Sequence, residues 1–138
     1  MKRFAKKGLC IIFVLMLITV CCVSVFAEVQ PRWKQLSTFS VNLQKKSGIF
    51  SNSYVLADAS SWNNTNTISL TVTIQKWNGS NYVNTSNSWS SSDKGGVSIE
   101  KNMNLATGNY IAHCVATVYD ANGNYVETVT QNSNEIII

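Results

Sequence analysis

The most reactive side chains of this sequence are His113 and Cys114, which are neighbours in the chain. A thiol beside an imidazole is the pairing that activates a cysteine nucleophile. Around this pair, however, the residues alternate as in a β-strand, where adjacent side chains point to opposite faces of the sheet. Cys114 has the parity of the apolar residues Ala112 and Ala116. We therefore expect Cys114 to be a buried core thiol and His113 to be a strand residue without a catalytic partner.

Metal and acid–base sites are not indicated either. His113 is the only histidine, and the three other cysteines lie within residues 1–27, so zinc and copper lack ligands. The segment Asp120–Glu127 lacks the length and the acids of an EF-hand loop, and its Asn122-Gly123 pair predicts a hairpin turn instead. The carboxylates lie mostly at turns or termini, so no glycosidase pair is expected. We predict no catalytic residue, no metal, no cofactor and no enzymatic activity.

Aromatic side chains are the remaining candidates for contact with a ligand. Trp33, Trp62, Trp77 and Tyr82 lie in expected loops or on a polar strand face, among Asn, Ser and Thr residues. Planar rings next to such donors suit a sugar or a peptide surface. The alternative is that Trp77 and Tyr82 pack on each other across a hairpin turn, and we favour it for this pair.

Residues 67–83 show how these rings are positioned. Apolar side chains occupy the even positions up to residue 74, and threonine, serine and glutamine occupy the odd ones, which is typical of a half-buried strand. Trp77 has the parity of the threonines. Whether the following Asn-Gly turn has two or four residues, Tyr82 joins Trp77 on the outer face, while Val83 and Trp89 are expected on the core side.

The same period-2 alternation recurs along the chain between clusters of Gly, Asn and Ser, without sustained helical spacing. The expected strands are residues 36–45, 49–57, 67–77, 82–89, 97–103, 109–119, 125–130 and 135–138. Seven or eight short strands without helices predict an all-β fold, an antiparallel β-sandwich that is immunoglobulin-like or jelly-roll-like. We expect one such domain over residues 36–138, preceded by a tether at residues 28–35.

Residues 1–27 have the features of a helical secretory signal peptide. Four basic residues precede an apolar run, and the small residues Val25 and Ala27 precede a predicted cleavage site after Ala27. The apolar run is slightly short for a bilayer span, which needs about 20 residues. We therefore predict a secreted, extracellular protein, and retention of this segment as a membrane anchor is the alternative.

Removal of the signal peptide changes the charge of the chain. Of 11 basic residues four lie in residues 1–27, so seven basic residues balance the seven acidic ones in the mature chain. A neutral chain has no excess charge for binding nucleic acid or an anionic membrane, and neither is expected as a partner. Cys114 is then the only cysteine and has no partner for an intramolecular disulfide.

Several short segments resemble those of a family of small, uncharacterised secreted β-sandwich proteins of Firmicutes-type Gram-positive bacteria, a domain of unknown function. The matching positions are Trp77, Asn78, Gly79, Tyr82, Val83, Gly108, Tyr110, Asn122, Gly123 and Glu127. Tyr82 stands where that family tends to have tryptophan. The resemblance implies a secreted β-sandwich and no particular activity.

These observations lead to three functional hypotheses. The first is a secreted, non-enzymatic β-sandwich that binds a glycan or a protein at the bacterial cell surface or in the medium. The alternative is a structural component that associates through sheet edges, with the apolar terminal segment 135–138 adding to a neighbouring sheet. A membrane-active toxin built from Ser/Thr-rich hairpins is the second alternative.

Overall fold

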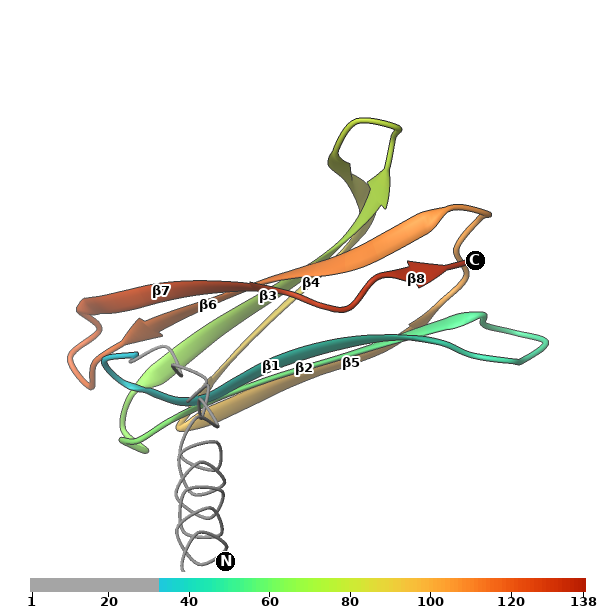
Figure 1. Ribbon diagram of the computed structural model, residues 1–138. Helices are drawn as coiled ribbons and strands as arrows, with labels where there is room; N and C mark the ends of the chain where they lie inside the picture. The colour runs from blue at the N-terminus through green and yellow to red at the C-terminus, as the bar shows by residue number, and fades with distance from the viewer. Residues whose placement is uncertain (1–32) are drawn as a thin grey trace, which may run out of the picture. The chain divides into compact units, whose positions relative to one another are not determined.

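The computed structural model describes residues 33–138, which form two antiparallel β-sheets facing each other (Figure 1). The strands are β1 (Leu36–Lys45), β2 (Ser53–Ser61), β3 (Thr67–Trp77), β4 (Tyr82–Lys94), β5 (Gly96–Met103), β6 (Asn109–Tyr119), β7 (Tyr125–Asn132) and β8 (Ile136–Ile137). No helix occurs among the described residues, so the predicted all-β antiparallel sandwich is confirmed. The predicted signal peptide and residues 28–32 of the predicted tether lie outside the described part of the chain.

The strand order identifies the type of sandwich. One sheet has the order β1-β2-β5, and the other has the order β4-β3-β6-β7, with β8 pairing with β6 beyond the end of β7. In the letters of an immunoglobulin domain these sheets are A-B-E and C′-C-F-G, which is the immunoglobulin-like order and not that of a jelly roll. The Tyr110 hydroxyl, at the start of β6, donates to the Ala106 carbonyl at 2.9 Å. This contact is the tyrosine corner of immunoglobulin-like sandwiches.

The core lies between the sheets and consists of alternate residues from each strand. Strands β2 and β3 alternate strictly between buried and half-buried positions over most of their lengths. The four even-numbered apolar residues of β3, from Ile68 to Ile74, have no exposed surface. The parity that the sequence predicted for β3 is therefore the parity of the structure.

Strand β2 differs from its prediction. Residues 49–57 were expected to form the strand, because Ile49 and Phe50 are apolar and have high β-propensity. The strand instead runs from Ser53 to Ser61, since Ser53 pairs with Lys45 at the end of β1 and the intervening residues must form the turn. Ile49 and Phe50 consequently lie at the tip of the β1–β2 hairpin.

The β3–β4 turn has four residues, because Trp77 pairs directly with Tyr82. The Asn78 side-chain oxygen accepts hydrogen bonds from the backbone N–H groups of Ser80 and Asn81 at 2.9 and 3.0 Å. Gly79 has a φ of 103°, a conformation that favours glycine. The two open alternatives for this turn are thus decided in favour of the longer one.

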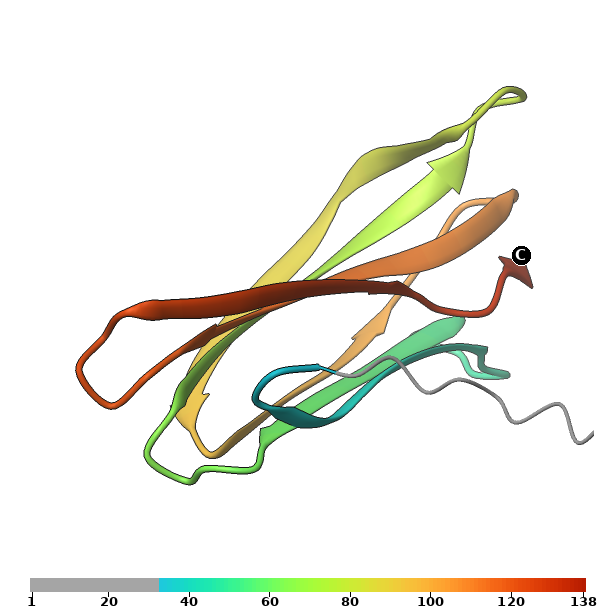
Figure 2. The ribbon, with the colours of Figure 1, turned by 60° about the vertical axis from the view of Figure 1, so that its left-hand side comes forward.

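The expectation for Val83 was wrong, whereas that for Trp89 agrees with the structure. Val83 is 39% exposed, because the β3–β4 hairpin projects beyond the facing sheet (Figures 1 and 2). Trp89 is half-buried and packs against the core. Parity assigns a side chain to a face of its own sheet, but burial also requires an opposing sheet.

Candidate functional site

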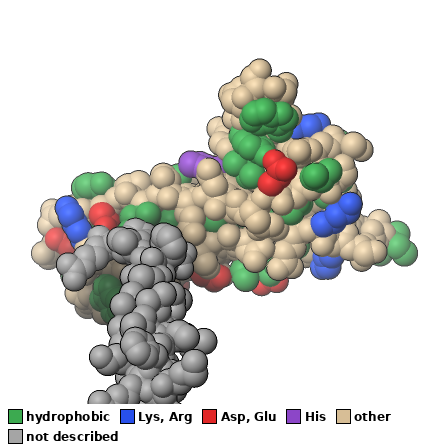
Figure 3. Space-filling model, in the orientation of Figure 1, with side chains coloured by type: hydrophobic (Ala, Val, Ile, Leu, Met, Phe, Trp, Pro, Cys, Tyr) green, Lys and Arg blue, Asp and Glu red, His purple; other side chains and the backbone are tan. Residues whose placement is uncertain are grey.

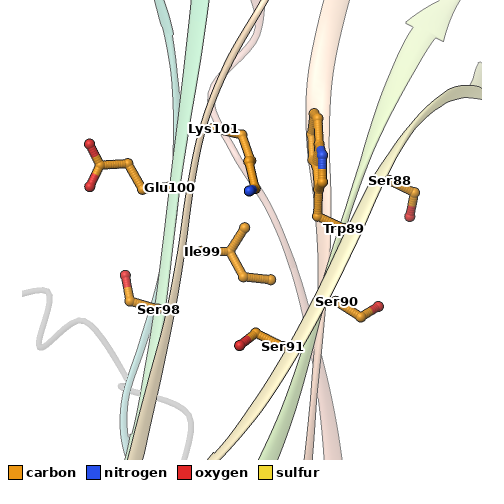
Figure 4. Close-up of a pocket in the computed structure, with 8 residues that line it drawn as sticks. All are labelled: Ser88, Trp89, Ser90, Ser91, Ser98, Ile99, Glu100 and Lys101. Atoms are coloured by element: carbon orange, nitrogen blue, oxygen red, sulfur yellow. The ribbon is translucent and has the colours of Figure 1, made fainter.

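The sandwich is open on the side where β4 and β5 lie, since each is the outer strand of its sheet. A cleft of about 530 Å³ lies between these two strands. It is lined by Ser88, Trp89, Ser90, Ser91, Ser98, Ile99, Glu100 and Lys101. Figure 4 shows Trp89 reaching toward the cleft from β4, and Ile99 and Lys101 reaching toward it from β5.

The chemical character of the cleft follows from which side chains enter it. The Trp89 ring is seen nearly edge-on in Figure 4, so one face of the indole is turned toward Lys101 and Ile99. The side chains of Ser98 and Glu100 point away, and so do those of Ser88 and Ser90, whose hydroxyls are hydrogen-bonded to threonines of β3 on the outer face. These four residues border the cleft with their main chain. The cleft therefore combines one aromatic face, one ammonium group and the polar edges of two strands. An aromatic face beside such hydrogen-bonding groups suits a neutral chain that carries both apolar faces and polar groups.

The opposite side of the sandwich, where β1 lies near β7 and β8, is closed by two side chains. The Glu127 carboxylate of β7 accepts hydrogen bonds from the backbone N–H groups of residues 34–36 at 2.7–3.0 Å. The Asn134 amide donates to the Leu43 carbonyl at 2.8 Å and accepts from the Leu43 N–H at 3.3 Å. These contacts satisfy part of the β1 edge, so the two sides of the sandwich differ.

The electrostatics of Glu127 follow from these contacts. Partial burial acts to raise the pKa of the Glu127 carboxyl, but the three backbone donors and Lys34 outweigh it, and the pKa lies below its ordinary value. Glu127 is therefore ionised at neutral pH and serves as a fixed acceptor for the chain that enters β1.

The four aromatic residues singled out in the sequence do not form one surface. Trp33 packs edge-on against Phe39 of β1, with ring centroids 6.1 Å apart, and lies against the core. Trp62 is 74% exposed in the connection before β3. Trp77 ends β3 and Tyr82 begins β4, at the other end of β3, whose 11 residues span about 32–34 Å. Two of the four rings thus lie at one end of the sandwich and two at the other.

Trp77 and Tyr82 pack on each other, as the favoured interpretation expected. Their ring centroids are 5.2 Å apart with an interplanar angle of 59°. The Tyr82 hydroxyl donates a hydrogen bond to the Glu135 carboxylate, and this bond raises the pKa of Tyr82. The pair therefore ties the projecting hairpin to the segment that precedes β8, while Trp77 stays 41% exposed.

His113 and Cys114 lie on opposite faces of β6, as predicted. The His113 ring, on the outer face, contacts the Asn132 side-chain oxygen at 2.7 Å. Cys114 has no exposed surface, and burial raises the pKa of its thiol to about 12. Within residues 33–138 no cluster of three or more His, Cys, Asp or Glu side chains is placed to hold a metal ion.

The cleft between β4 and β5 was not predicted from the sequence. Trp89 was assigned to the core by parity, and Lys101 was not singled out. Both lie at the open side because β4 and β5 are edge strands, and strand order does not follow from alternation within a strand. The available signal was a core-side tryptophan within a run of serines. Such a polar run is unusual for a strand that has a neighbouring strand on each side.

Among the described residues, no helix has the length and apolar character needed to cross a bilayer. Comparison of the chain with protein-family models, with curated proteins and with solved structures finds no match. The function is therefore inferred from the chemistry of the site.

Proposed function

We propose that the protein is a secreted, non-enzymatic binding module that holds an extended glycan chain in the cleft between β4 and β5. The single observation that carries this proposal is the open cleft with the Trp89 indole turned into it. Its volume of about 530 Å³ lies within the ordinary range of ligand sites. Secretion is supported by the signal-peptide features of residues 1–27.

The groups in the cleft suit a sugar for physical reasons. An indole face packs against the apolar face of a pyranose ring, and the Ser91 hydroxyl and the Lys101 ammonium group, both turned toward the cleft in Figure 4, can form hydrogen bonds with its hydroxyls. The cleft is open at the side of the sandwich, so a polymer can enter without its ends being threaded. Glu100 is the only carboxylate that borders the cleft, and its side chain points away, which supports binding without hydrolysis.

A glycan array probed with the wild type and with Trp89→Ala tests this proposal. Burial of an aromatic face against a sugar contributes at least about 1.4 kcal/mol, and each 1.4 kcal/mol is a factor of ten in affinity. Trp89→Ala is therefore expected to weaken glycan binding at least about tenfold. The matched control is Trp62→Ala, which removes the same side chain from an exposed position at one end of the sandwich. Trp77→Ala tests whether glycan binding depends on the projecting hairpin instead of the cleft. Equal binding by Trp89→Ala and wild type, or no glycan bound by either, refutes the proposal.

Strand addition is the second candidate function, and a separate observation favours it. Strands β4 and β5 each have a single strand partner, so both present unpaired backbone groups along the cleft. The terminal segment proposed as the added strand is used within its own chain, because β8 pairs with β6 and Ile136 is buried. Any added strand therefore comes from a different segment of this chain or from another protein. Light scattering that finds only monomer at high concentration counts against self-association through these edges.

A further inference from the structure

Most of the exposed large hydrophobic side chains lie at one end of the sandwich. This hairpin end consists of the β1–β2 turn, the β3–β4 turn, the β5–β6 connection and the C-terminus. Among the described residues the exposed large hydrophobics are Ile49, Phe50, Trp62, Trp77, Val83, Tyr125 and Ile137. Only Trp62 and Tyr125 belong to the opposite end. Figure 3 shows hydrophobic patches on the projecting hairpin and at the tip on the right.

The β1–β2 turn is the most exposed of these sites. Ile49 is 94% exposed and Phe50 is 89% exposed, so neither side chain contributes to the core. Lys45 and Lys46 stand immediately before the turn and are exposed. The Lys46 ammonium donates to the Asn102 side chain at 3.1 Å, which holds this charge at the base of the tip. An adjacent aliphatic and aromatic pair therefore projects beyond a pair of lysines.

The charges of the described residues are also separated along the molecule, although their sum is zero. The half that includes the hairpin end carries Lys45, Lys46, Lys76, Lys101, Glu100 and Glu135. The other half carries Lys34, Lys94, Asp58, Asp93, Asp120 and Glu127. The hairpin end thus has an excess of lysine over glutamate. Of its two glutamates, Glu135 accepts hydrogen bonds from the side chains of Tyr82 and Asn109. A count over the whole sequence cannot detect this separation.

We propose that the hairpin end docks on an anionic lipid surface, with Ile49 and Phe50 entering the interface between headgroups and acyl chains. Apolar side chains at a projecting tip gain from leaving water there, while the lysines at its base remain level with the lipid phosphates. Each lysine near an anionic surface adds to the attraction, and salt weakens it. A protein partner would require a groove that fits the tip but would not require the lysine pair, so the charge favours lipid.

Co-sedimentation with lipid vesicles tests this proposal. The full chain is exported from a Gram-positive host and recovered from the medium, so all variants share one N-terminus. Vesicles contain either phosphatidylcholine alone or phosphatidylcholine mixed with phosphatidylglycerol. We expect binding to the anionic vesicles only, weakened at least about tenfold in the double variant Ile49→Ser/Phe50→Ser. Lys45→Gln/Lys46→Gln is expected to weaken binding about tenfold or more and to reduce its salt dependence.

The control variant is Trp62→Ser/Tyr125→Ser, which removes two exposed aromatic side chains from the opposite end and is expected to bind vesicles as the wild type does. Circular dichroism checks that each variant keeps its β-structure. The proposal is overturned by absence of vesicle binding, by equal binding to neutral vesicles, or by an equal loss in the control. A dimer in light scattering that requires Ile49 and Phe50, without vesicle binding, would instead assign the tip to a second copy. The vesicles contain no glycan, so this outcome is independent of the cleft.

Discussion

Glu127 offers the sharpest test of how the sandwich is held together. Its carboxylate is the shared acceptor for three consecutive backbone N–H groups, and two of these bonds are partly buried. A hydrogen bond to a charged group contributes about 1.5–3 kcal/mol, and three bonds to one carboxylate are not additive. We therefore expect Glu127→Ala to lower the free energy of unfolding by about 2–4 kcal/mol. Glu127→Gln keeps an acceptor without the charge and is expected to cost about half as much, because charge-assisted bonds are roughly twice as strong as neutral ones.

The pH dependence gives the same prediction a second readout. The pKa of Glu127 is lower in the folded state than its ordinary value of 4.5, so the ionised carboxylate stabilises the fold. This contribution is complete above the ordinary pKa and is lost as the pH falls through the folded-state pKa. The difference in unfolding free energy between wild type and Glu127→Gln should therefore be full at neutral pH and shrink in acid.

Urea denaturation followed by circular dichroism at neutral and acidic pH measures both effects. The matched control is Glu100→Gln, at an exposed glutamate on β5, for which little change is expected. Thermal unfolding offers an independent check, since 1 kcal/mol shifts the midpoint by about 4–8 °C in a domain slightly smaller than this one. A Glu127→Gln protein as stable as the wild type at neutral pH, or a difference that does not change with pH, would show that the charge of this carboxylate does not stabilise the fold.

Three further predictions concern the core and the turns. Tyr110→Phe removes the bond to the Ala106 carbonyl and should lower the free energy of unfolding by about 1–2 kcal/mol in urea denaturation. Cys114 should not react with a thiol reagent at mildly alkaline pH in the native protein and should react fully in denaturant, because burial raises the pKa of the thiol to about 12; rapid native labelling would contradict this. Gly123 has a φ of 83° with open space around it, so Gly123→Ala isolates the backbone cost of the left-handed conformation and should destabilise by about 1–2 kcal/mol; unchanged thermal stability would show that the turn relaxes freely.

Strand alternation was a reliable guide where both faces of a strand have distinct environments. Strands β1, β3 and β6 have the expected bounds, and Cys114 and His113 occupy opposite faces of β6. Alternation failed where the environment depends on other strands. Residues 49 and 50 have strand-forming side chains, yet the pairing of Lys45 with Ser53 places them in a turn. Val83 has core parity but lies beyond the facing sheet.

The candidate site was harder to predict than the fold. Trp77 and Tyr82 were found from the sequence because a hairpin is a local structure, and their contact follows from parity and turn length. The cleft beside Trp89 was not found, since it depends on which strands end up at the edges of the two sheets. Lys101 in particular lies across from Trp89 only through the crossing of the chain from one sheet to the other.

By itself, the sequence determined the class of the fold, the core face of β3, the buried thiol and the packing of the hairpin aromatics, because each depends on residues that are close along the chain. The tertiary structure alone decided the strand order, the closure of one side by Glu127 and Asn134, the open cleft on the other, and the separation of charge between the two ends. These features depend on contacts between residues far apart in the sequence, such as residues 34–36 with Glu127. Such contacts form only when the two sheets pack together, so they cannot be predicted from any one segment of the chain.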